Sequence, residues 1–200
     1  GDVVANLMFA GNMWASFISL NMALEHTGAR FLPLAGNMDL EFALFALKHF
    51  GANSIISIPT VLLSIARLVE ERKIEGLKLR KAATGGEHLF PGARAYLSRV
   101  LGIETFASAG YAANDSGAIG YQCDHCHGGS IHHVHEDLHY VEIVDPDTLE
   151  PVPPDEVGKI IATNLNRRLM PMLRYDIGDL GRWVEGPCGC GRTTRRFELM

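Results

Sequence analysis

Four cysteines, the only ones in this chain of 200 residues, occur as two close pairs. One pair is Cys123 and Cys126, and the other is Cys188 and Cys190. Two short-spaced pairs that a fold brings together form a tetrahedral thiolate site, the usual arrangement of structural zinc. Because roughly 60 residues separate the pairs, such a site requires the chain to fold back and tie two distant segments together.

Histidines near the first pair offer alternative ligands for this site. Residues 131–135 contain three of them, and His133 or His132 could replace one cysteine. Two unrelated pairs of free thiols are the simpler alternative. Disulfides are less favoured, because residues 1–6 show neither the basic start nor the cleavage-like run of a secretory signal, so we expect a cytoplasmic protein.

Composition argues against nucleic-acid and membrane partners. The net charge is −5, so no general basic field attracts nucleic acid. Residues 3–24 carry no charge and are long enough to cross a bilayer, but they include Asn6, Asn12 and Asn21, whose polar side chains are costly in lipid. We interpret this stretch as a buried strand and helix.

The first 117 residues alternate helical and strand patterns. The apolar spacing predicts helices at residues 12–26, 39–50, 61–71 and 91–101, and strands at residues 30–34, 54–59, 79–84 and 104–108. Strands separated by helices of this length predict βαβ units and a doubly wound, mostly parallel sheet. Ligands of such sheets bind beyond the carboxyl ends of the strands, which directs attention to residues 85–87 and to Gly110 and Tyr111.

The pattern changes near residue 118. Residues 139–144 and 159–163 alternate with period two, and turn-forming clusters separate these segments. This second part, residues 118–200, is predicted to be a small antiparallel, barrel-like β-subdomain. It contains both cysteine pairs.

The segment from His135 to His139 matches the HExxH signature of zinc proteases. That chemistry needs a helix, because positions i and i+4 must lie close enough to share one metal ion. An extended segment would separate the two histidines by roughly 13 Å, too far for one zinc. We therefore interpret the histidines of residues 131–139 as one candidate structural ligand and solvent-facing neighbours.

Residues 171–180, with the sequence PMLRYDIGDL, resemble the P-x-x-R-Y-x-x-G-D motif of adenylate-forming enzymes. The segment CGCGRT at residues 188–193 is similar to one in the phenylacetate–CoA ligase branch of that superfamily, as are residues 136–146 and 81–89. Several motifs thus occur in the family's order between about residue 50 and the end of the chain. The resemblance implies the same fold as the periodicity does.

The resemblance also implies a nucleotide site. Asp179 would accept hydrogen bonds from both ribose hydroxyls of ATP, and Tyr111 would pack flat on the adenine. The loop of Gly85, Gly86 and Glu87 would border the other face of the ring, since glycine permits close backbone approach. Taken singly, these residues have simpler interpretations as a cap, a core aromatic and a turn.

A magnesium ligand is implied four residues after Tyr111. The family has a glutamate there that helps to hold Mg²⁺, whereas this chain has Asp115, whose side chain is one methylene shorter. Ala112 also stands where the family has glycine. Both departures weaken the assignment of Asp115 to magnesium.

The implied reaction joins a carboxylic acid to coenzyme A at the expense of ATP. An acyl-adenylate and pyrophosphate form first, and thiol attack then gives acyl-CoA and AMP. The branch acts on aryl-acetic or aromatic acids, and Phe9, Met13 and Trp14 are candidates to line the acid pocket, although an apolar helix more often serves a core. The phosphate-binding loop is expected upstream of Gly1, and the mobile C-terminal domain with its catalytic lysine beyond Met200. We therefore expect the isolated 200 residues to be inactive.

Two alternatives remain open. One is a zinc-ribbon-like binding module without catalysis, which would bind nucleic acid or protein and have no affinity for ATP. The other is an adenylate-forming enzyme with an acceptor other than coenzyme A. The expected partners of a ligase are a small carboxylic acid, ATP, Mg²⁺ and coenzyme A, with a structural Zn²⁺, and a homodimer is left open.

Overall fold

The computed structural model describes residues 1–126 and 129–200, which form two compact units, residues 1–109 and 110–200. The division falls after Ala109, whereas the change in sequence pattern suggested a boundary near residue 118. The segment in between belongs to the second unit because its strands pair with the antiparallel sheet. In the part of the chain that the structure describes, no helix is long and apolar enough to cross a membrane.

The first unit is built on a five-stranded parallel sheet with the strand order β2-β1-β3-β4-β5. Its strands are β1 (Val3–Leu7), β2 (Arg30–Pro33), β3 (Ser54–Ser57), β4 (Lys81–Thr84) and β5 (Thr105–Ser108). Its helices are α1 (Ser16–Glu25), α2 (Leu40–His49), α3 (Pro59–Glu71) and α4 (Pro91–Leu101). The predicted parallel sheet with intervening helices is therefore confirmed, although β1 and α1 occupy only part of the stretch that was expected to be strand and helix.

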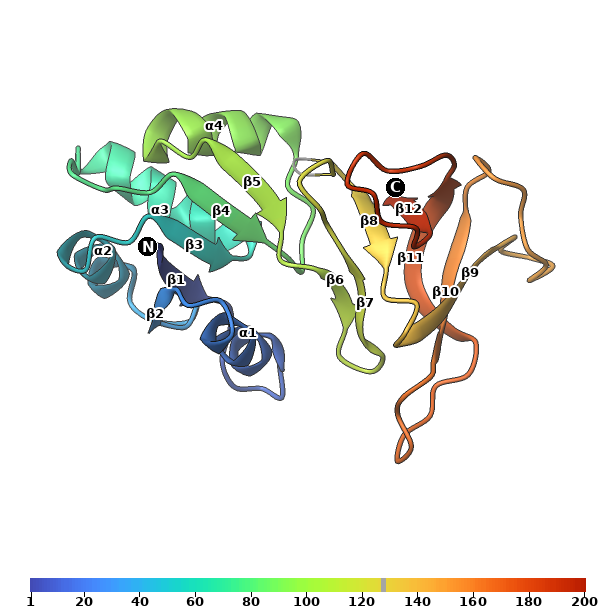
Figure 1. Cartoon of the computed structure of the whole chain (residues 1–200). Coiled ribbons are helices and arrows are strands. Elements are labelled where there is room, and N and C mark those ends of the chain that lie inside the picture. Colours follow the sequence, from blue (N-terminus) through green and yellow to red (C-terminus); the bar gives the residue numbers. More distant parts are fainter. Residues whose placement is uncertain (127–128) are drawn as a thin grey trace. The chain divides into compact units, whose positions relative to one another are not determined.

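Helices cover both faces of this sheet (Figure 1). On one face α2, α3 and α4 form the main core, in which Leu47, Ile55, Leu62 and Leu97 are almost wholly buried. Helix α1 packs on the other face, where Leu24 meets Val4 of β1. The βαβ connections place the carboxyl ends of β3 and β4 at one edge of the sheet, where α3 and residues 85–87 begin.

Local sequence sets several helix ends. The Asp39 carboxylate accepts a hydrogen bond from the Phe42 amide, 3.3 Å away, and so caps α2. Pro59 and Pro91 occupy the first positions of α3 and α4, where the missing amide hydrogen does no harm. Pro59 was expected to end the preceding strand, but its fixed φ suits the first helical turn equally well.

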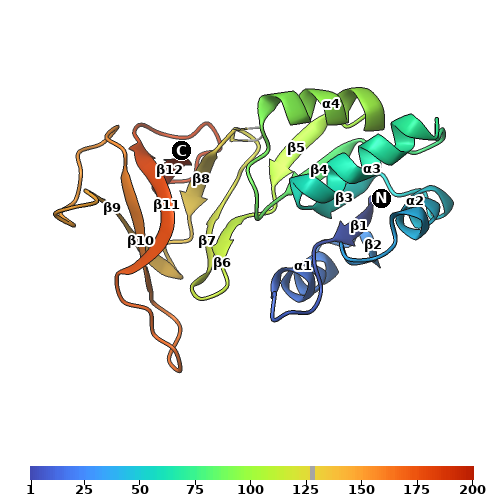
Figure 2. The same ribbon diagram turned by 180° about the vertical axis from the view of Figure 1, so that it is seen from behind.

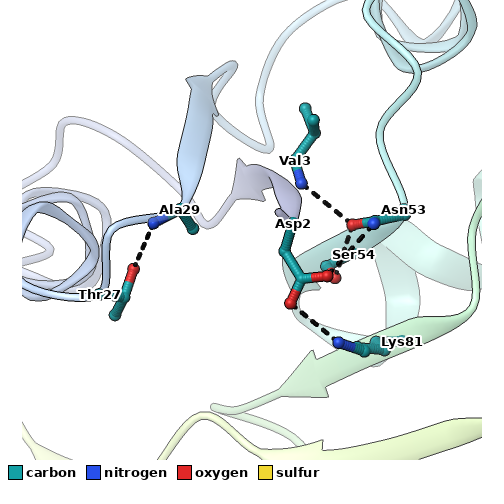
Figure 3. A network of polar contacts seen from close by, with 7 residues as sticks. All are labelled: Asp2, Val3, Thr27, Ala29, Asn53, Ser54 and Lys81. Atoms are coloured by element: carbon teal, nitrogen blue, oxygen red, sulfur yellow. Dashed lines mark hydrogen bonds and ion pairs between the residues drawn. The ribbon is translucent and has the colours of Figure 1, made fainter.

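A polar network joins β1, β3 and β4 at their amino ends (Figure 3). The Lys81 ammonium lies 2.8 Å from the Asp2 carboxylate, and the Asn53 amide donates to the same carboxylate at 3.2 Å. Asn53 also accepts from the Val3 backbone amide. These contacts lie at the edge of the sheet opposite to the carboxyl ends of the strands, so they belong to the framework of the fold.

Two apolar helices are less covered than their sequences predicted. In α2 the buried face carries Ala43, Leu44 and Leu47, while Phe42 and Phe45 are more than half exposed. In α1, Ile18 and Met22 are also more than half exposed, as are Met13 and Trp14 before it. The helix predicted at residues 39–50 is apolar nearly all round in sequence, yet within the described residues only one of its faces is covered, because a helix contacts the sheet with one face.

The second unit is a seven-stranded antiparallel sheet with the order β6-β7-β8-β12-β11-β10-β9 (Figure 2). Its strands are β6 (Tyr111–Ala113), β7 (Gly117–Tyr121), β8 (Ile131–Val134), β9 (His139–Val144), β10 (Gly158–Asn164), β11 (Tyr175–Val184) and β12 (Arg196–Leu199). Phe197, Ile119, Ile143 and Ile160 form its core. The expected antiparallel β-structure after the parallel sheet is confirmed.

The HExxH segment is a turn and not the extended strand that we expected. The amides of Leu138 and His139 both donate to the carbonyl of His135, so β9 begins only at His139. The two side chains have different partners, since the His135 ring lies tilted against the Tyr121 ring at a centroid distance of 4.6 Å and His139 Nε2 lies 2.9 Å from the Ser116 carbonyl.

The histidines of this region are also more buried than predicted. His132, His133 and His139 have relative exposures of 3%, 0% and 3%. The interpretation as solvent-facing neighbours was therefore wrong for His132 and His139. In both cases the side chain lies on the strand face that packs into the second unit, so it has to find its polar partners there.

Candidate functional site

Two residues that were expected to bind one adenosine lie in direct contact. Tyr111 opens β6 and Asp179 lies in β11, and the Tyr111 hydroxyl donates to Asp179 Oδ2 at 2.8 Å. The two side chains therefore lie side by side in the second unit, and the binding of adenosine by them stays a prediction. Asp179 itself is exposed, so its second carboxylate oxygen remains accessible to a ligand.

Tyr111 is largely buried. Only 8% of it is exposed, and its ring meets Phe197 edge-on with a centroid distance of 5.3 Å. Burial raises the pKa of the Tyr111 hydroxyl, and its hydrogen bond to the Asp179 carboxylate raises it further. The hydroxyl is therefore protonated and acts as a fixed donor. The role predicted for the ring, packing on adenine, stays a prediction.

Asp115 lies at the tip of the turn between β6 and β7. Its side chain is exposed, and Oδ2 accepts a hydrogen bond from the Tyr175 hydroxyl at 2.8 Å. That bond is the largest of the causes that raise the pKa of Tyr175. An exposed carboxylate with one oxygen already oriented can hold a cation with the other.

The glycine loop after β4 belongs to the first unit. Gly86 has a φ of 77°, a conformation that glycine adopts without strain. The Glu87 carboxylate accepts hydrogen bonds from the backbone amide and the hydroxyl of Thr60, at 2.9 and 2.6 Å. Glu87 thus caps the amino end of α3, an interaction favoured by the helix dipole. A contact of Gly85, Gly86 and Glu87 with adenine stays a prediction.

The two cysteine pairs meet in the second unit. Cys123 Sγ lies 3.5 Å from Cys126 Sγ and 3.6 Å from Cys188 Sγ, although Cys123 and Cys188 are 65 positions apart. Each pair forms a tight turn, closed by hydrogen bonds from the Cys126 amide to the Cys123 carbonyl and from the Gly191 amide to the Cys188 carbonyl. The segment after β7 is thereby brought beside the segment before β12.

The geometry of this cluster suits a tetrahedral metal. Four ligands at about 2.3 Å from one zinc ion lie about 3.8 Å from one another, close to the sulfur–sulfur distances of the cluster. Ligand atoms of Cys123, Cys126, Cys188 and His133 all lie within 4.8 Å of one another, and all four residues are buried. Soft thiolates and an imidazole are the donors that zinc prefers.

The cluster contains a fifth donor. Cys190 Sγ lies 3.6 Å from His133 Nε2, while His133 Nδ1 lies 3.0 Å from the Thr194 hydroxyl. A backbone hydrogen bond from Arg192 is the main cause that lowers the pKa of Cys190 to about 7. Burial raises the pKa of Cys123. Four cysteines, or three with His133, are thus in reach, whereas the alternative ligand His132 stacks on Phe197 and does not belong to the cluster.

Several polar residues of this region were missed by the sequence analysis. Tyr175 lies inside the recognised motif, yet nothing in that motif indicated a contact with Asp115. Arg167, His139 and Asn164 lie around the same turn and were assigned no role. Their positions follow from strand pairing between β9 and β10, which local sequence does not reveal. No local signal identifies them.

No protein-family model matches the chain. It is 30% identical over 182 residues to phenylacetate–coenzyme A ligase of Thermus thermophilus, covering 90% of this chain and 40% of that protein. The enzyme of the same name from Pseudomonas putida is 27% identical over 188 residues, which is 93% of this chain and 42% of that enzyme. The chain thus spans about 40% of the length of the curated relatives it matches.

Solved structures show the same fold. A crystal structure of 2-hydroxyisobutyryl-CoA ligase with 2-HIB-AMP and CoA superposes with a TM-score of 0.85 at 20% identity, covering 98% of this chain and 42% of that one. At this identity the likeness concerns the fold. Together with the sequence matches, it confirms the resemblance seen in the motifs. Over about 90% of its length, the chain is homologous to phenylacetate–CoA ligases, and it has the fold of acid–CoA ligases of the adenylate-forming family.

Proposed function

We propose that the chain is the central part of an ATP-dependent acid–CoA ligase that acts on an aryl-acetic or aromatic acid. The observation that carries this proposal is the hydrogen bond of Tyr111 to Asp179, within a chain whose curated relatives are phenylacetate–CoA ligases. The carboxylate of the acid attacks the α-phosphate of ATP and releases pyrophosphate. The thiol of coenzyme A then attacks the acyl-adenylate, forms the thioester and releases AMP.

The residues of this chain bind and orient the nucleotide. Asp179 accepts hydrogen bonds from the ribose hydroxyls, with the Tyr111 hydroxyl holding one of its oxygens. Asp115 supplies a carboxylate ligand to Mg²⁺, and the bound Mg²⁺ offsets the negative charge of the phosphates. The loop of Gly85, Gly86 and Glu87 borders the adenine. Positioning and electrostatic stabilisation are the contributions expected of this part of the protein.

We further propose that the cysteine cluster binds one structural zinc ion. Cys123, Cys126 and Cys188 supply three ligands, and either Cys190 or His133 supplies the fourth. Four protein ligands leave no position for a reacting water, so the metal stabilises the fold and does not take part in the reaction. A metal content of one zinc per chain is expected.

The test of the proposed function is ATP–pyrophosphate exchange with the full-length protein that carries this chain. A panel of aryl-acetic, benzoic and short fatty acids is screened, and exchange is expected with the aryl acids. Exchange with an acid but no thioester when coenzyme A is added would favour another acceptor. A protein that shows no exchange with any acid and no affinity for ATP would contradict the proposal and favour a zinc-ribbon-like binding module. The cytoplasmic location and a homodimer remain predictions.

A further inference from the structure

Three side chains contact the backbone carbonyl oxygens of the turn that carries Asp115. The Arg167 guanidinium donates to the carbonyl of Asp115. The next carbonyl, that of Ser116, accepts a hydrogen bond from Asn164 Nδ2 at 2.7 Å and lies 2.9 Å from His139 Nε2, which is itself 2.9 Å from Asn164 Nδ2. Two consecutive carbonyls of one exposed turn are therefore bound by side chains, which fixes the orientation of the peptide between them.

These three side chains come from separate segments of the second unit. His139 begins β9 and Asn164 ends β10, and the two residues are direct partners across that strand pair. Arg167 follows β10. His139 and Asn164 are 3% and 7% exposed, and Ser116 is 1% exposed, whereas Asp115 itself faces solvent. Two buried side chains, His139 and Asn164, and the partly exposed Arg167 thus support a turn that exposes the Asp115 carboxylate.

Gly117 adapts the turn to Arg167. Its φ is 90°, and a Cβ at this position would lie 2.9 Å from Nη2 of Arg167. Any other residue would meet the guanidinium and also strain the backbone. The absence of a side chain at Gly117 therefore lets Arg167 approach the Asp115 carbonyl.

The buried polar residues Ser116, His139 and Asn164 are not arranged for stability alone. Among the described residues, Ser116 Oγ, His139 Nδ1 and Asn164 Oδ1 are buried and have no hydrogen-bond partner. Unpaired polar atoms in a protein interior are unfavourable, and apolar side chains of similar shape would avoid them. What the polar side chains provide is a defined position for the Ser116 carbonyl, and through it for the Asp115 carboxylate.

We propose that His139, Asn164 and Arg167 are positioning residues that hold the Asp115 carboxylate, together with Tyr175, in the orientation that binds the magnesium ion of the nucleotide complex. The inference rests on the proposed function, because the role of Asp115 in magnesium binding belongs to it. The three residues act through the backbone of the turn and touch neither nucleotide nor metal. Magnesium binding would then require these three side chains in addition to the residues of the recognised motifs.

The experiment compares three variants of the full-length protein, each with a single substitution. His139→Phe keeps an aromatic ring and removes the ring nitrogen that lies against Ser116 and Asn164, His139→Gln restores a polar group there, and Arg167→Gln removes the guanidinium at a site where little is buried. Arg168→Gln, an exposed neighbour, is the matched control. Two quantities are measured: the Mg²⁺ concentration for half-maximal ATP–pyrophosphate exchange, and the amide hydrogen exchange of residues 114–118.

We expect His139→Phe and Arg167→Gln to raise the half-maximal Mg²⁺ concentration at least fivefold and to speed amide exchange of the turn at least tenfold. The KM for the acid should not change, and His139→Gln and Arg168→Gln should behave like the unmodified protein. A role in folding alone would not separate magnesium from the acid in this way. If both variants keep the magnesium dependence and the amide protection of the unmodified protein, the inference is overturned.

Asp115→Asn separates the two levels of the proposal. If Asp115→Asn leaves the magnesium dependence unchanged, Asp115 is not a magnesium ligand. The proposal that the three side chains serve magnesium binding is then refuted as well. Faster amide exchange in His139→Phe would then still support the three side chains as the support of the turn. If Asp115→Asn raises the magnesium requirement and His139→Phe does not, the proposed function stands and the positioning role is refuted.

Discussion

Replacing Tyr111 by phenylalanine distinguishes the two ways in which this side chain can serve a nucleotide. The substitution keeps the ring and its edge-on contact with Phe197, and removes only the hydroxyl that donates to Asp179 at 2.8 Å. If Tyr111 serves by packing on adenine, phenylalanine should replace it without loss. If it serves by orienting the Asp179 carboxylate, the loss of the hydroxyl should be felt at the ribose.

The expected magnitude follows from the environment of the pair. A hydrogen bond to a charged group contributes about 1.5–3 kcal/mol. The contribution here is at or below the lower end of this range, because water can solvate the exposed Asp179. We therefore expect a loss of about 1 kcal/mol in the free energy of unfolding, or about 3 °C in melting temperature. The same energy at the ribose corresponds to about a fivefold change in affinity.

The assay compares ATP with 2′-deoxyATP in the full-length protein. Tyr111→Phe should reduce the preference for ATP about fivefold, while Tyr140→Phe, a tyrosine on the exposed side of β9, should leave it unchanged. A Tyr111→Phe protein with unaltered stability and unaltered ATP preference would refute the orienting role. Should Tyr111→Leu then abolish nucleotide affinity, packing on adenine would be the correct account.

The remaining predictions concern pH, metal and backbone. Since the pKa of Tyr111 is raised in the folded protein, its contribution to stability is complete below about pH 10 and is lost as the pH rises further, so urea titrations above pH 10 should show a steeper loss in the unmodified protein than in Tyr111→Phe. Removing zinc with a chelator should lower the melting temperature by roughly 10 °C, since a cross-link across 65 positions contributes on the order of 4 kcal/mol, and an unchanged temperature would contradict a structural metal. Gly117→Ala should destabilise the second unit by about 1–2 kcal/mol, because φ is 90° and Arg167 must move, and Gly186→Ala, with a φ of 77° and no atom near its Cβ, separates the backbone strain from the collision in thermal unfolding.

Local sequence was sufficient wherever an element is determined by its own residues. The Asp39 cap, the proline that opens α4 and the apolar run of β3 were readable, because caps, fixed φ angles and buried aliphatic side chains act within a few positions. Pro59 was assigned to the strand before it, although it opens α3. The parallel sheet followed from the spacing of these elements. Exposure was less predictable: Phe42 and Phe45 look like core residues in the sequence, yet the sheet contacts only the opposite face of α2.

Strands that depend on distant partners were missed. Strand β7 contains Gly117 and Gly120, and β11 contains Gly178 and Gly181, so neither shows the alternation of a typical strand. Pairing explains the glycine at position 181, since a Cβ there would lie 2.8 Å from the Glu198 carbonyl on β12. The residue that obscures the strand in the sequence is the one that allows its neighbour to approach.

The candidate site divides along the same line. Asp179, Tyr111 and the cysteine pairs were found because motifs and spacing mark them, whereas Asn164 and His139 meet only because β10 and β9 pair in one register. That register is fixed by the core partners Ile160 and Ile143, not by the polar residues themselves. A slip by one residue would turn Asn164 to the other face of the sheet, and the Ser116 carbonyl would lose that donor. Core substitutions that loosen this strand pair should therefore impair the Asp115 turn before they unfold the unit.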